Sequence, residues 1–200
     1  MADIIYTYGG SAYMNITNKC PCACIFCIRS NGDGLGSADS LWLKGDPTID
    51  EIKAEIDNFD FSEYDEVVFC GYGEPTQALD NLIESAKYLK EKHSLKIRLN
   101  SNGLSDLING KPTAHLLEGV VDSISISLNA PDSEAYQRVT HSKFGEDAYP
   151  ALLKFAEECK QYIPSVKFTV VDVISEEEIK ECKKISEKMG IPLRVREWIK

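Results

Sequence analysis

The stretch ITNKCPCACIFCIRSNG, residues 16–32, holds four of the seven cysteines within eight positions. Cys20, Cys24 and Cys27 form the spacing C-x3-C-x2-C, and Cys22 is an extra thiol between them. Thiolates at such spacings suit iron-sulfur clusters or zinc. A closed structural zinc site usually has a second pair of Cys or His ligands, which this region lacks. Three ligands on a four-iron cluster would instead leave one iron open to another ligand.

Composition predicts one soluble globular domain over residues 1–200, with 43% hydrophobic and 27% charged residues. The 32 acidic and 22 basic residues give a net charge of -10, which argues against generic nucleic-acid binding. No apolar run approaches the roughly 20 residues that cross a bilayer, and the N-terminus does not resemble a targeting segment. We therefore expect a cytoplasmic protein without membrane contact, in which reduced thiols are available for metal.

Short β-rich runs alternate with amphipathic helical patterns along the rest of the chain. The opening IIYTYGGSAYMNI predicts a hairpin that turns at Gly9–Gly10 and leads into the first core strand. Thr48 with Glu51, and Ser175 with Glu178, have the spacing of capping boxes at helix starts. Further strands are expected over residues 66–70, 96–100, 123–129, 167–173 and 193–197.

Six strands separated by helix-containing crossovers predict a parallel α/β sheet with right-handed connections. Periodicity leaves open a doubly wound sheet or an incomplete eight-stranded barrel, and both bind ligands at the carboxyl ends of the strands. The cysteines follow the first strand, GYGEPT (residues 71–76) the second, NSNG (residues 100–103) the third, and SLNAP (residues 127–131) ends the fourth. We expect these segments to converge on one edge of the sheet.

The cysteine spacing, with Phe26 before the last cysteine, resembles the signature of radical S-adenosylmethionine (SAM) enzymes. In that family the open iron is chelated by the amino and carboxylate groups of SAM. The resemblance implies that Cys20, Cys24 and Cys27 bind a [4Fe-4S] cluster and that Cys22 points away. It also implies a partial (β/α)6 TIM-like barrel of parallel strands after the N-terminal hairpin.

Two further segments match the same family. GYGEP (Gly71–Pro75) looks like its Gly-Gly-Glu-Pro motif, which holds the methionine amino group, although Tyr72 interrupts the glycine pair. NSNG (Asn100–Gly103) resembles the strand-end segment beside the ribose and carboxylate in the activating-enzyme branch. Tyr72, Arg138 and His141 are candidates for substrate contact, and no catalytic residue is assigned. The resemblance implies cofactor binding by Phe26, Gly71, Tyr72, Gly73, Glu74, Pro75, Asn100, Ser101, Asn102, Ser127, Asn129, Val171 and Asp172.

The implied activity is reductive cleavage of SAM to a 5′-deoxyadenosyl radical, which abstracts hydrogen from a substrate. A protein segment, as in the activating-enzyme branch, and a small metabolite or nucleotide held under the loop of residues 31–46 are both compatible substrates. The resemblance implies an electron donor such as flavodoxin or ferredoxin. The open side of a six-strand barrel predicts a bulky substrate such as a protein segment, or closure by a partner subunit or by the loop of residues 31–46 with Trp42. At finer grain the chain resembles a small subgroup associated with TatD-type hydrolases, which implies a functional link to such a hydrolase. The non-enzyme alternative is an iron-sulfur electron carrier, with Cys22 or Cys70 as fourth ligand.

Overall fold

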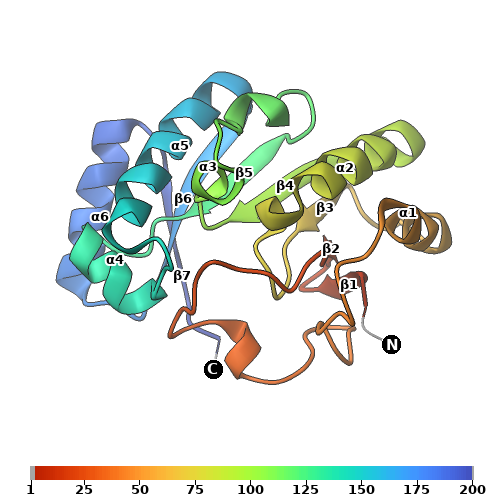
Figure 1. Cartoon of the computed structure of the whole chain (residues 1–200), viewed down its shortest axis with the longest axis horizontal. Coiled ribbons are helices and arrows are strands. Elements are labelled where there is room, and N and C mark those ends of the chain that lie inside the picture. The colour runs from red at the N-terminus through yellow and green to blue at the C-terminus, as the bar shows by residue number, and fades with distance from the viewer. Residues whose placement is uncertain (1–2, 200) are drawn as a thin grey trace.

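A computed structural model describes residues 3–199 and contains one mixed sheet. The strands of this sheet follow each other in sequence order from β1 to β7 (Figure 1). β1 (Ile5–Tyr8) and β2 (Ser11–Met14) are antiparallel and form the predicted hairpin. Every later neighbour is parallel. The later strands are β3 (Glu66–Phe69), β4 (Lys96–Ser101), β5 (Ser123–Ser127), β6 (Ser165–Val171) and β7 (Leu193–Arg196).

The unbroken strand order decides between the two architectures that periodicity leaves open. A doubly wound sheet reverses its strand order at a switch point, whereas a barrel adds each strand beside the last. Six parallel strands follow in sequence order, and β1 and β7 at the two edges do not pair with each other, so the sheet forms a partial, unclosed barrel as predicted. The helices lie on its outer side in Figure 1. They are α1 (Ile49–Asn58), α2 (Leu79–His93), α3 (Ser105–Asn109), α4 (Ser133–Thr140), α5 (Ala148–Tyr162) and α6 (Glu176–Met189).

Helix starts follow the local sequence closely. The Thr48 side chain accepts a hydrogen bond from the Glu51 backbone N–H, and the Glu51 carboxylate accepts from the Thr48 N–H in return. Ser175 and Glu178 form the same reciprocal pair at the start of α6. Both predicted capping boxes are present, because each satisfies backbone donors that have no partner within the helix.

Three of the strands predicted by range differ from the observed ones by one residue at an end, and the other two differ by two residues. The strand expected over residues 123–129 stops at Ser127, because Asn129 has a left-handed φ of 55° and cannot continue the extended chain. The strand expected over residues 167–173 runs from Ser165 to Val171. Because β5 ends at Ser127, residues 128 and 129 turn at the carboxyl edge of the sheet instead of extending the strand.

The main hydrophobic core lies between the outer face of the sheet and the helices. Ile97 and Leu99 of β4 and Ile124 and Ile126 of β5 are fully buried there, together with Phe155 of α5. The intervening residues of these strands are polar and face the inside of the partial barrel, because side chains alternate along a strand. Within residues 3–199 no helix has both the length and the apolar character that a bilayer crossing requires.

Replacing Phe155 with alanine should destabilise the fold by about 3–5 kcal/mol, because its ring is fully buried and the neighbours cannot collapse into the space. Lys154→Ala on the same helix is the matched control, since Lys154 is exposed and forms a surface ion pair with Glu158 at 3.5 Å. Urea unfolding of the two variants measures the difference. Equal losses of stability would contradict the assigned core.

Candidate active site

Glu74 joins two of the segments that the sequence places at the carboxyl edge of the sheet. It follows β3, and its side chain is buried. Its Oε2 accepts from the Asn102 backbone N–H at 2.7 Å, and its Oε1 accepts from the Ser101 hydroxyl at 2.8 Å. Oε1 also accepts from the Thr76 hydroxyl at 2.8 Å and from the Thr76 N–H at 3.2 Å. Burial raises the pKa of Glu74, while these donors act in the opposite direction.

The cysteine loop joins the same edge. The Glu74 backbone N–H donates to the Lys19 carbonyl at 2.9 Å, so the end of β3 holds the start of the loop. From the end of β4, the Asn102 side-chain nitrogen lies 4.0 Å from the Sγ atoms of both Cys20 and Cys22. The segments after β2, β3 and β4 therefore converge, as the parallel strands predict.

Backbone contacts from α4 support the far side of the cysteine loop. The N–H groups of Ala23 and Ile25 donate to the carbonyls of Thr140 and Val139, at 2.9 and 3.0 Å. The Lys143 N–H donates to the Pro21 carbonyl at 2.8 Å. Hydrogen bonds to a segment more than a hundred residues away in sequence thus hold this irregular loop. No sequence pattern predicts these bonds.

Arg29 holds the same loop from its carboxyl end. Its guanidinium donates to the carbonyls of Asn18, at 3.3 Å, and Cys22, at 3.4 Å, and lies 5.8 Å from the ring centroid of Trp42. The sequence analysis missed this residue. Its position two residues after Cys27 is the only signal that sequence carries.

The four thiols of the loop differ in exposure. Cys22 is 4% exposed and packs in the main core, whereas Cys20, Cys24 and Cys27 are partly exposed. The Cys22 thiol is close enough to Cys20 and Cys24 to interact with both. The burial of Cys22 supports its place outside a cluster, which stays a prediction. Phe26 packs against the main core beside them.

Gly71 and Gly73 lie where the chain after β3 packs closely against residues 15–19. A Cβ atom on Gly73 would lie 2.2 Å from the Thr17 carbonyl oxygen and 2.8 Å from that of Lys19. A Cβ on Gly71 would lie 2.1 Å from Asn15 Oδ1. Gly73 therefore permits the close approach of two backbone segments, and Gly71 leaves room for the Asn15 side chain.

The remaining expected cofactor residues surround the inside of the partial barrel. Asn100 and Ser127 line a cavity of about 460 Å³ there. Asn129 is buried, and its Oδ1 accepts from the Val171 N–H at 3.3 Å. Asp172 lies beyond the strand end, where its carboxylate accepts from the Trp198 N–H at 2.7 Å.

The candidate substrate contacts are scattered. The Tyr72 hydroxyl donates to the Gly32 carbonyl at 2.6 Å, and its ring packs edge-on against Trp42, so it holds the loop of residues 31–46. Arg138 forms an ion pair with Glu178 of α6 on the outer side. Arg138 and His141 line a surface depression on α4 rather than the central cavity. Their roles remain predictions.

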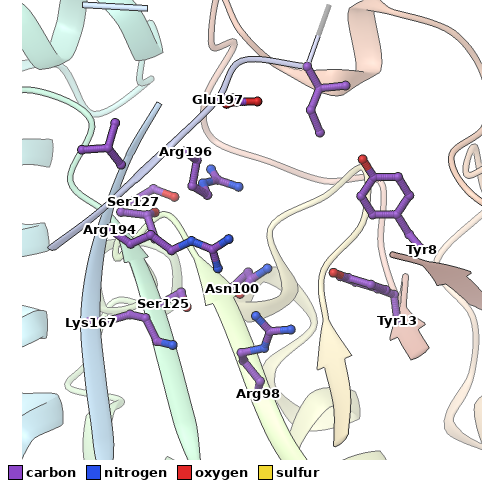
Figure 2. Close-up of a pocket in the computed structure, with 13 residues that line it drawn as sticks. Tyr8, Tyr13, Arg98, Asn100, Ser125, Ser127, Lys167, Arg194, Arg196 and Glu197 are labelled. Carbon is purple, nitrogen blue, oxygen red and sulfur yellow. The ribbon is translucent and has the colours of Figure 1, made fainter. Parts of the chain in front are cut away.

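The central cavity contains a set of residues that the sequence analysis passed over. The sequence does indicate a polar inner face, because β4, β5, β6 and β7 alternate polar and apolar residues. Parallel strands buried on both faces are usually continuous apolar runs. Polar members such as Arg98, Ser125 and Lys167 point into the cavity (Figure 2). The missed lining residues include Tyr13, Arg98, Ser125, Lys167, Arg194 and Arg196.

The donor set fits a polynuclear cluster better than a single ion. Among residues 3–199 no group of three or more His, Cys, Asp and Glu side chains could hold one metal ion. In an iron-sulfur cluster each thiolate binds a different iron, so the cysteines lie further apart. Three partly exposed thiols lie on one loop, beside backbone that only glycine permits, and are available as ligands to such a cluster.

Comparisons with known proteins agree with this arrangement. A 27% identical relative from Thermoanaerobacter sp. (strain X514), named as the dual-specificity RNA methyltransferase RlmN, matches over 82% of this chain and 45% of its own length. A 28% identical protein of Methanocaldococcus jannaschii, named as a glycyl-radical enzyme activating enzyme, matches over 68% of this chain and 55% of its own. The chain thus spans about half the length of these relatives.

A solved structure described as native anSMEcpe with bound AdoMet shares the fold, with a TM-score of 0.66 and 18% identity over 94% of this chain and 50% of that one. The sequence model of the family described as the Radical SAM superfamily matches residues 14–185, which is most of the chain. The protein therefore belongs to the radical SAM superfamily of enzymes.

Proposed function

We propose that this chain binds a [4Fe-4S] cluster through Cys20, Cys24 and Cys27 and uses it to cleave SAM. Family membership implies this pair of cofactors. The observation that carries the assignment to these residues is the hydrogen-bonded link from Glu74 through Asn102 to the cysteine loop. It joins three motifs, separated in sequence, at the strand edge where α/β folds bind ligands.

When both are bound and one electron is supplied, the cluster and SAM provide methionine and a 5′-deoxyadenosyl radical, which removes a hydrogen atom from the substrate. The protein's part is to bind, orient and exclude water. Glu74 fixes the end of β4 relative to the end of β3, so it is a positioning residue for both motifs. Gly71 and Gly73 keep the backbone open beside the cysteine loop.

Asn100 is a further group that we propose faces SAM. Its Oδ1 is buried and has no hydrogen-bond partner within residues 3–199. Because a buried acceptor without a partner is costly, a ligand hydroxyl or amino group would stabilise this position. Ser127 lines the same cavity from β5 and would lie on the ribose side.

The partners follow from the chemistry and from the relatives. Reductive cleavage needs a one-electron donor of the flavodoxin or ferredoxin class. The M. jannaschii relative, named as an activating enzyme, favours a protein substrate or a closing partner subunit, whereas the cavity inside the barrel favours a small molecule. None of the relatives described above bears a TatD-type name, so the link to such a hydrolase stays a prediction.

Replacing Cys24 with alanine should reduce bound iron at least about fivefold and abolish 5′-deoxyadenosine formation, because a cluster ligand is removed. Cys22→Ala should retain both. Iron analysis and mass spectrometry of anaerobically reconstituted protein, supplied with SAM and a strong reductant, measure the two quantities. Cys182→Ala, which removes a buried thiol from α6, controls for the general effect of losing a cysteine.

Loss of the cluster in Cys22→Ala together with its retention in Cys24→Ala would contradict the ligand assignment. Loss in all three variants, including Cys182→Ala, would indicate unfolding, which circular dichroism detects directly. Iron loading without any change in cluster spectra on SAM addition would contradict SAM binding.

Replacing Gly73 with alanine should displace the cysteine loop, because the new Cβ meets two backbone oxygens at less than 3 Å. We expect a stability loss of about 1–3 kcal/mol and a clear drop in bound iron. Gly45→Ala is the matched control, since a Cβ there meets nothing within 4 Å. Thermal unfolding and iron analysis of both variants test the contact; an unchanged iron content in Gly73→Ala would refute it.

A further inference from the structure

The cavity inside the partial barrel concentrates positive charge in a protein that is acidic overall. Arg98 of β4, Lys167 of β6, and Arg194 and Arg196 of β7 all line it, while the chain carries a net charge of -10. Glu197 is the one acidic residue among the described lining residues. The cations are therefore gathered from three strands into one space of about 460 Å³.

Strand geometry accounts for the gathering. Arg98 and Asn100 are two residues apart on β4, and Arg194 and Arg196 are two apart on β7, so each pair points to the same face. Neighbouring strands continue the row, because Asn100 pairs with Ser125, which in turn pairs with Lys167. Figure 2 shows these side chains directed into one space.

Most of these cations lack a counter-ion. Arg98 Nε lies 2.9 Å from Glu66 Oε1, although this contact lacks the alignment of a good hydrogen bond. Within the described chain, residues 3–199, no ion pair involves Lys167, Arg194 or Arg196. Arg194 and Arg196 are exposed on the edge strand β7, and their like charges lie two residues apart on one face of it.

An aromatic wall faces the cations. Tyr8 and Tyr13 of the N-terminal hairpin lie on the other side of the cavity from Lys167, Arg194 and Arg196 (Figure 2). Their rings meet edge to face with centroids 6.4 Å apart. Such a wall packs against a flat, apolar part of a ligand.

We propose that this cavity binds a small phosphorylated substrate, with its phosphate on Lys167, Arg194 and Arg196 and its ring against Tyr8 and Tyr13. Arginine suits phosphate because its planar fork of donors matches the oxygens. The cavity volume lies within the range of small-molecule sites. This inference rests on the proposed function, since it names the substrate class for the same site.

The charge distribution favours a small anion over a nucleic acid. The acidic surface repels a long polyanion, because binding one needs many phosphates to be neutralised across a wide face. A cavity lined by several cations instead raises the local concentration of an anion small enough to enter it.

Phenyl phosphate, which carries one ring and one phosphate, is the probe, and phenol and inorganic phosphate are the matched half-probes. Isothermal titration calorimetry of anaerobically reconstituted protein with SAM present measures binding. We expect phenyl phosphate to bind at least about tenfold more tightly than either half-probe. Lys167→Ala and Arg194→Ala should each weaken it about tenfold, and Tyr13→Ala should remove the advantage over inorganic phosphate.

Lys180→Ala is the charge-matched control, because Lys180 is exposed on the outer helix α6, and it should leave binding unchanged. Equal weakening by Lys180→Ala would show a general charge effect and overturn the proposal. Competition between phenyl phosphate and SAM at one site would also overturn it, since the cations would then serve the SAM carboxylate. Tighter binding of single-stranded RNA, lost in the same cavity variants, would replace the small molecule by a nucleic acid.

Formation of 5′-deoxyadenosine by the wild-type protein separates the two proposals. Cleavage of SAM without phenyl phosphate binding would overturn the substrate class and leave the radical chemistry standing. Phenyl phosphate binding without SAM cleavage under any reductant would leave an anion site and overturn the proposed function.

Discussion

The buried carboxylate of Glu74 is the contact on which the arrangement of the site depends. Parallel strands bring their carboxyl ends to one edge, but they do not fix the loops that follow. Glu74 does so, because its oxygens accept from Ser101 and Asn102 while its own N–H holds Lys19. Removing the carboxylate would leave several donors without a partner in a region that water hardly reaches. A residue expected to contact a cofactor thus also holds the scaffold together.

The cysteine loop has little regular structure and still has a defined place. Its position comes from backbone hydrogen bonds to residues 139–143 and to Glu74, and from the guanidinium of Arg29. Backbone-to-backbone contacts restrict geometry without restricting side-chain chemistry. The thiols therefore stay available for ligation while the chain that carries them is held.

Sequence predicts those features whose physical cause is local or periodic. The capping boxes at Thr48 and Ser175 depend on residues three positions apart, and the strand edge follows from the repeat of strand and helix. The support that Arg29 and residues 139–143 give the cysteine loop could not be predicted, because backbone carbonyls accept from any sequence. The end of β5 was misplaced for a similar reason, since the left-handed Asn129 depends on its bond to Val171 across the sheet.

The polar inner face of the barrel could have been predicted from the sequence, but the sequence analysis did not predict it. Strand identification weighs apolar residues, and the apolar members of β4 and β5, such as Leu99 and Ile126, pack outward against the helices. The residues that alternate with them along each strand point to the inner face and are polar. Polar residues at these positions would be costly in a sheet buried on both faces. Because the barrel is unclosed, water can solvate these groups until a ligand replaces it. Lys167, Arg194 and Arg196 form no ion pair within residues 3–199, so the inner face is less stable than one with apolar packing. An anion bound between them would compensate for part of that loss.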